Sequence, residues 1–239
     1  MVFSDTTTNL GIIQACEDQC GLGITGISGD SNKLKEFTRY ANRANRKIWH
    51  WIFTSQGIWQ YDDSNETGQP EGTASLVDST AIYALPTGTL TVRRVEIKDS
   101  DGNWFELDQI AESDIPEAIP EYDSSDGQPN QYRLIGDEIQ LFPAPDYAST
   151  DGLKVYFDRT STDFANSDTT QTPGFATPYH DLVAIGASLE WLKSKRPDAN
   201  TIGLLREDWL RGEQEVIEFY SQRNKDTKTV IRPSRRAFK

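Results

Sequence analysis

The sequence predicts an α+β fold in which the N- and C-terminal helices form a helical bundle with an inserted antiparallel β domain. Near both ends of the chain, apolar residues recur at steps of three and four, which is the spacing of helices packed along one face. In the middle they alternate with polar residues, as in half-buried strands. Strands grouped between groups of helices are typical of α+β proteins. The predicted domains are residues 1–56, 57–160 and 161–226, followed by an extended C-terminal arm over residues 227–239.

Two helices are predicted in residues 1–56. The first runs from about Thr8 to Cys20, where Thr8 or Asn9 can cap its start. Its packed face comprises Leu10, Ile13, Cys16 and Cys20. A second, longer helix begins at a cap formed by Asp30, Ser31 or Asn32 and reaches about Phe53. Its apolar stripe comprises Leu34, Phe37, Ala41, Ala44, Ile48 and Trp51.

Two hairpins and one long strand are predicted in residues 57–160. The first hairpin turns at Asp99–Asn103, and the shift in alternation between Val92 and Val95 indicates a β-bulge before it. The second turns at Gly136-Asp137. The long strand covers Leu153 to Arg159, and the acid- and proline-rich stretch from Asp108 to Asp126 is predicted to be an exposed loop.

Two further helices are predicted in residues 161–226. The first begins near Pro178, which suits the first turn of a helix, and ends at about Lys195. The last starts near Asp198 and runs to about Arg223. Its packed face comprises Ile202, Leu205, Trp209, Val216, Phe219 and Tyr220.

The charge of the chain is strongly negative and unevenly distributed. A formal net charge of -13 argues against binding nucleic acid through a basic patch. No Lys or Arg occurs from Met1 to Asn32, whereas the last residues are basic and contain no acid. A basic end on an acidic protein is typical of an interaction segment. We predict that the arm binds its partner through Lys228, Arg232, Arg235, Arg236, Phe238 and Lys239.

The sequence gives no sign of export or of membrane insertion. The N-terminus lacks the basic start and apolar stretch of a signal peptide, so the protein is expected to be made and kept in the cytoplasm, at least at first. In that compartment Cys16 and Cys20 are expected to stay reduced, as buried small side chains.

None of the short motifs predicts an enzyme, a metal site or a cofactor. The run Gly21–Gly26 matches G-x-G-x-x-G, but a helix precedes it instead of a strand, so a flexible connector is the better interpretation. Asp99–Asn103 resembles the opening of a calcium loop, yet the glycine is out of register. His50 and His180 have no partner at metal-ligand spacing and no G-x-S-x-G motif accompanies them. We therefore expect a structural protein without a cofactor.

The chain resembles the head-to-tail adaptor, or connector, proteins of tailed bacteriophages, including those called tail tubular protein A. Three stretches carry the resemblance. They are residues 39–49 leading into Gly57-Ile58-Trp59, residues 92–98 with the turn at residues 101–104, and Leu141–Pro145 followed by residues 155–159 and Pro173–Ala176.

This resemblance implies a structural protein of the virion neck. It implies a ring of identical subunits, most often a dodecamer, that docks under the portal protein, often by a C-terminal arm. The other face of the ring meets the next tail or nozzle protein, and DNA passes through the lumen without specific binding. The acidic composition suits such a channel, because basic contacts would hold DNA through its phosphates.

A second interpretation is a β-sandwich binding module of a tail fibre or receptor-binding part. Trp59, Trp104 and Tyr122 would then be its natural contacts with a sugar or a host surface. The predicted helical pairs at both ends of the chain count against it. An enzyme such as a hydrolase is the least favoured class, because no pair of acids stands out from the many in the chain.

Overall fold

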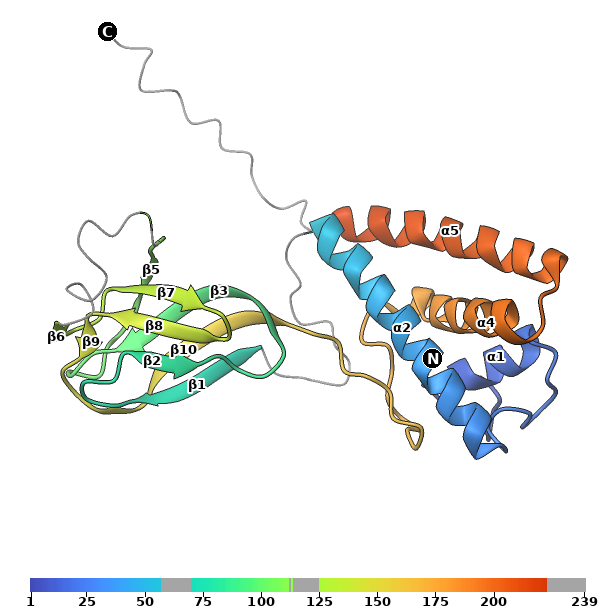
Figure 1. The fold of residues 1–239 in the computed structure, drawn as a ribbon, viewed down its shortest axis with the longest axis horizontal. Helices are drawn as coiled ribbons and strands as arrows, with labels where there is room; N and C mark the ends of the chain where they lie inside the picture. Colours follow the sequence, from blue (N-terminus) through green and yellow to red (C-terminus); the bar gives the residue numbers. More distant parts are fainter. Residues whose placement is uncertain (57–69, 112, 114–124, 223–239) are drawn as a thin grey trace, which may run out of the picture. The chain divides into compact units, whose positions relative to one another are not determined.

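The computed structural model describes residues 1–56, 70–111, 113 and 125–222 and shows a mixed α+β fold (Figure 1). The chain divides into two compact units, one made of Met1–Glu66 with Ser161–Lys239 and one made of Thr67–Thr160. The first unit is helical and the second consists of strands. The α+β class is therefore confirmed, whereas the domain boundaries given above, with a separate arm from residue 227, remain predictions.

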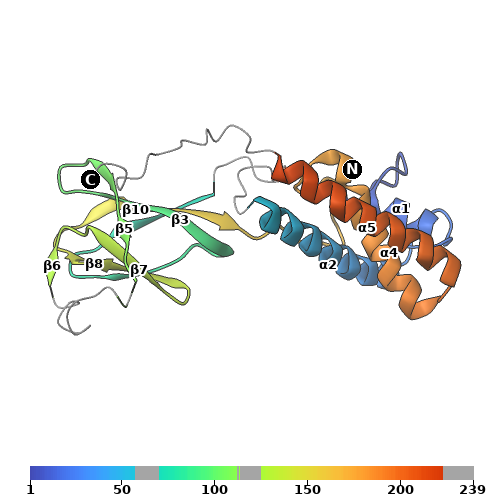
Figure 2. The ribbon, with the colours of Figure 1, turned by 90° about the horizontal axis from the view of Figure 1, so that it is seen from above.

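The helical unit is organised around one central helix. The α-helices of its described residues are α1 (Ile12–Gln19), α2 (Ser31–Gln56), α4 (Asp181–Lys195) and α5 (Ala199–Ser221), and a short 3-10 helix, η2 (Thr177–Tyr179), precedes α4. Helix α4 packs against α1, α2 and α5 (Figures 1 and 2). It is buried on most sides, which explains why its sequence is apolar or small except at Asp181, Glu190, Lys193 and Lys195.

Close approach between α4 and its neighbours depends on Gly186. A Cβ atom at this position would lie 2.6 Å from a ring carbon of Trp209 on α5 and 2.7 Å from the Cβ of Ala44 on α2. The Trp209 ring in turn packs on Trp51, with 4.9 Å between ring centroids. A glycine here lets the three helices share one aromatic core.

The helix starts follow capping chemistry, and one of them corrects the prediction. Asp30 caps α2 through the backbone N–H groups of Asn32 and Lys33, and Asp198 caps α5, as the sequence predicts. Helix α1, however, begins at Ile12 and not at Thr8, because the Asp5 carboxylate accepts the N–H groups of Thr7 and Thr8 in a separate turn.

Two residues assigned to packed faces are instead exposed. Leu10 precedes α1 and is 68% exposed, because the positive φ of Asn9 (59°) turns the chain before the helix begins. Phe219 on α5 is 47% exposed, although its ring centroid lies 5.5 Å from that of Tyr179. Both predictions of burial were wrong, and both residues leave apolar surface in water.

The strand unit consists mainly of two four-stranded sheets that share one core. One sheet has the order β1-β10-β3-β4 and the other β2-β8-β7-β5. The first contains β1 (Glu71–Leu76), β3 (Thr89–Lys98), β4 (Trp104–Glu106) and β10 (Ser149–Arg159). The second contains β2 (Ile82–Ala84), β5 (Asp108–Gln109), β7 (Gln131–Ile135) and β8 (Glu138–Phe142). A short pair, β6 (Asp126–Gly127) and β9 (Ala144–Pro145), completes the unit.

Most strand pairs are antiparallel, and the predicted hairpins and bulge are confirmed. The turn after β3 is closed by the Asp99 N–H, which donates to the Asn103 carbonyl at 2.9 Å, and β7 pairs with β8 around Gly136 at φ 59°. In the β3–β10 ladder Tyr156 faces Arg94 and Phe157 faces Val92, so Arg93 is the extra residue of the bulge. The parallel pairs β5–β7 and β6–β9 are features that the sequence analysis did not anticipate.

Candidate functional site

The residues predicted to form the binding arm lie outside the described residues: Lys228, Arg232, Arg235, Arg236, Phe238 and Lys239. Of the aromatic contacts named for the alternative interpretation, Trp59 and Tyr122 also lie outside them. Trp104 is 39% exposed, and the ammonium groups of Lys154 and Lys98 lie 5.0 and 6.0 Å from its ring centroid. The two candidate binding surfaces described next are grooves in the helical unit.

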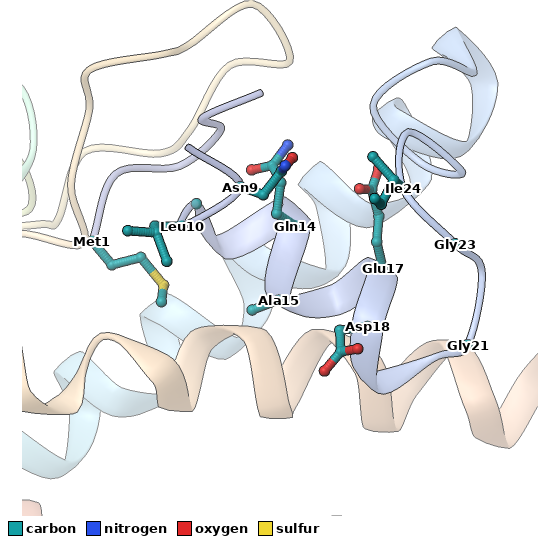
Figure 3. A pocket seen from close by; sticks show the side chains of 11 residues that line it. Met1, Asn9, Leu10, Gln14, Ala15, Glu17, Asp18, Gly21, Gly23 and Ile24 are labelled. Atoms are coloured by element: carbon teal, nitrogen blue, oxygen red, sulfur yellow. The ribbon is translucent and has the colours of Figure 1, made fainter. Parts of the chain in front are cut away.

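A groove crosses the outer side of α1, and we call it the α1 groove (Figure 3). Met1 and Leu10 lie on one side of it, Gly21, Gly23 and Ile24 lie on the other, and side chains of α1 lie between them. The groove is lined by Met1, Asn9, Leu10, Gly11, Gln14, Ala15, Glu17, Asp18, Gly21, Gly23 and Ile24.

The wall that carries Leu10 is held in place by the core. The Phe3 ring stacks on Phe164 with 4.6 Å between centroids, and the backbone N–H of Phe3 donates to the Gln171 carbonyl at 2.8 Å. Further along, the Asp5 N–H donates to the Gln14 side-chain oxygen at 2.8 Å. This segment is therefore tied both to α1 and to the loop before η2.

The opposite wall is held by one buried carboxylate. Glu17 is 3% exposed and accepts the backbone N–H groups of Thr25, Ile27 and Ser28 at 3.1, 2.9 and 2.7 Å. The Ser28 hydroxyl donates to it as well, at 2.9 Å. Loop donors converging on one ionised oxygen pair make a strong local anchor. The segment from Gly21 to Gly29 thus connects α1 to α2, but Glu17 fixes its path and presents Ile24.

This anchor was not predicted from the sequence, although the sequence contains a signal for it. Glu17 follows Cys16 directly and falls between Ile13 and Cys20, on the face that the helical spacing predicts to be packed. An acid on an apolar face needs buried partners. The glycine-rich loop that follows can bend its backbone N–H groups inward, and so it is the natural source of those partners.

A second groove lies between α2, α4 and α5 and is rich in cations. It is lined by Arg43, Ala44, Lys47, Gly186, Leu189, Glu190, Lys193, Arg206, Trp209, Leu210 and Glu213. Arg43 pairs with Glu190 at 3.1 Å, and the Lys47 ammonium lies 5.5 Å from the Trp209 ring centroid. The Arg43 contact thus joins α2 to α4, and the Lys47 contact joins α2 to α5.

The two cysteines are buried, as predicted. Burial raises the pKa of the Cys20 thiol to about 11 and holds the pKa of Cys16 even further above its ordinary value. Both thiols are therefore protonated at neutral pH, which makes them poor nucleophiles and poor metal ligands. Within the part of the chain that the structure describes, no group of three or more His, Cys, Asp or Glu residues could hold a metal ion.

The buried histidine has a structural environment. The Nε2 atom of His180 lies 2.7 Å from the Phe175 carbonyl, and its Nδ1 atom lies 2.9 Å from the N-terminal nitrogen of Met1. Burial lowers the pKa of His180. Its ring thus joins the start of the chain to the start of α4, whereas His50 is exposed on α2.

Comparison with known protein families shows which family this chain belongs to. The sequence matches the family described as SU10 adaptor protein over residues 11–229. The chain belongs to this family. A comparison with curated proteins gave no significant match. This adaptor is therefore a structural protein of the phage head-to-tail connection in the virion neck, in contact with portal and tail components.

The match extends over both compact units of the adaptor, so the strand unit and the helical unit both belong to the shared architecture. It favours the adaptor over a receptor-binding module. It ends at residue 229, and so most of the predicted arm residues, from Arg232 to Lys239, lie beyond it. Among the described residues, none of this adaptor's helices is both long and apolar enough to cross a membrane.

Proposed function

We propose that this adaptor forms a ring of identical subunits, in the dodecameric form implied by its resemblance to connector proteins. The ring would join the portal to the next tail or nozzle protein and surround the DNA as it passes. The observation that carries this proposal is the family match over residues 11–229, which includes both units of the fold. Assembly would take place in the host cytoplasm before the tail is completed.

Apolar surface on α5 supports lateral contacts between subunits. Leu204, Leu210 and Phe219 of this helix are well exposed, whereas Trp209 and Tyr220 of the same helix are buried. Large apolar side chains left exposed on an outer helix can be covered on association.

The charge of the chain supports passage of DNA without capture. A net charge of -13 disfavours stable contacts with phosphates, because such contacts draw their affinity from cations that displace the counterions of DNA. We propose that the basic residues act instead in protein contacts. The arm, from Lys228 to Lys239, would bind the portal or a neighbouring subunit.

Mass measurement of the neck complex tests the ring. Adaptor assembled on its portal, or released from virions together with it, is analysed by native mass spectrometry and imaged by electron microscopy. We expect one closed ring of adaptor subunits with cyclic symmetry around the channel. A single adaptor per portal, or a trimer attached at a fibre position, would refute the proposal.

A further inference from the structure

The α1 groove carries the most exposed apolar side chains of the described protein. Ile24 is 78% exposed and Leu10 is 68% exposed, and no other large apolar residue among those described exceeds them. Both flank the same groove, one on each wall (Figure 3). Because the Glu17 carboxylate and the Phe3 stack hold these walls, neither side chain can fold back into the core without breaking buried contacts. A fixed apolar cleft of this kind is suited to receive a partner.

We propose that the α1 groove binds the basic C-terminal segment, residues 223–239, of a second copy of this chain. The inference rests on the ring proposed above and names the contact that would link one subunit to the next. It also chooses between the two partners of the arm, the neighbouring subunit and the portal, in favour of the neighbour.

Charge favours this occupant. The groove contains the exposed carboxylate of Asp18 and none of its lining residues is Lys or Arg, although the Arg196 guanidinium lies close to Gly21 at one wall. The C-terminal segment supplies Lys228, Arg232, Arg235, Arg236 and Lys239, with no acid after Asp226. The same segment carries Val230, Ile231 and Phe238, which would meet Leu10 and Ile24. Groove and segment therefore match in apolar content, and Asp18 supplies one attractive charge for the basic segment.

The position of the two elements favours a second copy. Helix α4 contacts both α1 and α5 and lies between them in Figure 1. The described chain ends just after α5, at Gln222, whereas the groove lies on α1, across α4 from that helix. Two different surfaces that bind each other from copy to copy make a head-to-tail contact, and such contacts close into rings.

Photo-crosslinking of the full chain tests the contact. Ile24 is replaced by benzoylphenylalanine, the adaptor is assembled on its portal, and the products of irradiation are identified by peptide mass spectrometry. We expect a product of two adaptor chains in which position 24 is joined to residues 223–239. The same photoreactive residue at Val77, which is 52% exposed in the strand unit, is the matched control and should not capture that segment. Crosslinks to the portal, crosslinks within one chain, or no capture of this segment would overturn the proposal.

Charge exchange gives a second readout in the same assay. Asp18→Lys should lower the crosslink yield by about tenfold, because one attractive contact becomes repulsive. Adding Arg235→Glu and Arg236→Glu should restore most of the yield. Asp101→Lys, an equal charge change at an exposed turn of the strand unit, should leave the yield unchanged. Equal effects of Asp18→Lys and Asp101→Lys, or no restoration, would contradict the contact.

The mass of each assembled complex is recorded in parallel, so that the two proposals fail separately. A complete ring without the crosslink would overturn the groove contact and leave the ring intact. A single adaptor chain on the portal would overturn the ring and, with it, the contact between copies.

Discussion

Replacing Glu17 should destabilise the helical unit, and the structure predicts by how much. One carboxylate oxygen accepts the Ile27 N–H, the Ser28 N–H and the Ser28 hydroxyl, and the other accepts the Thr25 N–H. In Glu17→Ala the N–H of Ile27, a fully buried residue, loses its acceptor and gains no access to water. A buried donor left without a partner costs about 1–3 kcal/mol. With the partly buried Ser28 donors included, we expect a total loss of about 3 kcal/mol.

Glu17→Gln should cost less than Glu17→Ala. The glutamine oxygen can still accept the three hydrogen bonds from Ile27 and Ser28. Its side-chain NH2 group would then face the Thr25 N–H, a second donor that it cannot accept, but Thr25 is an exposed residue. Loss of the charge weakens the remaining bonds, since charge-assisted hydrogen bonds are roughly twice as strong as neutral ones. We therefore expect a loss of about 1–2 kcal/mol for this variant.

Urea unfolding measures these differences through tryptophan fluorescence, because Trp49, Trp51, Trp191 and Trp209 all lie in the core of the helical unit. Asp18→Ala is the matched control. It removes an adjacent but exposed carboxylate and should change the unfolding free energy by less than about 0.5 kcal/mol. Hydrogen exchange at the Ile27 amide should accelerate in Glu17→Ala alone. An unfolding free energy for Glu17→Ala equal to that of Asp18→Ala would refute the anchoring role of Glu17.

Three further predictions concern other parts of the fold. Gly186→Val should lower the free energy of unfolding by at least about 1–3 kcal/mol, because the new side chain overpacks against Trp209 and Ala44. Gly203→Ala, where the added Cβ meets open space, should instead stabilise α5 by about 0.5–1 kcal/mol. Equal changes in melting temperature for the two variants would contradict this prediction. Arg93→Met should lower the free energy of unfolding by about 3–5 kcal/mol, because it leaves the buried Asp158 carboxylate without its guanidinium partner. In urea unfolding, the double variant Arg93→Met with Asp158→Leu should recover much of that loss. The Cys20 thiol has a folded pKa of about 11 against an ordinary value of 9.0, so the unfolded chain releases this proton first as pH rises. Stability should therefore fall as pH rises between these two values, and Cys20→Ala should make that part of the curve of melting temperature against pH less steep, while the buried Cys16 thiol continues to contribute.

Local patterns in the sequence predict much of this fold. The stripe from Leu34 to Trp51 predicts α2 because a helix packed along its length needs apolar residues every three to four positions. The Gly136 turn and the bulge at Arg93 can also be read from local alternation, since both features act on neighbouring residues. Helix α4 shows the limit of this method. Its stripe is visible, but its burial on most sides follows from three partners that are distant in sequence.

The candidate site was harder to predict because its geometry depends on contacts that the spacing of residues does not encode. The expected first turn of α1 instead forms the Asp5 turn, and this shift places Leu10 in water. The parallel pairing of β5 with β7 likewise joins segments through tertiary contacts and not through a hairpin. The predicted arm is a feature of composition alone, since clustered cations indicate a binding segment without indicating where it binds.

Glu17 connects the stability of this adaptor to its proposed assembly. A loop that presents Ile24 on a path fixed by buried hydrogen bonds loses little conformational freedom when a partner covers it, and preorganisation of this kind strengthens binding. A mobile Ile24 would have to be ordered at the moment of contact, at a cost of about 1–2 kcal/mol for each residue fixed. Glu17 therefore has two roles: it stabilises the helical unit, and it fixes in place one wall of the surface that a second copy would bind. Because Glu17→Gln keeps most of the loop bonds and Glu17→Ala does not, assembly should decline in the same order as loop anchoring, even though Glu17 itself need not touch the partner.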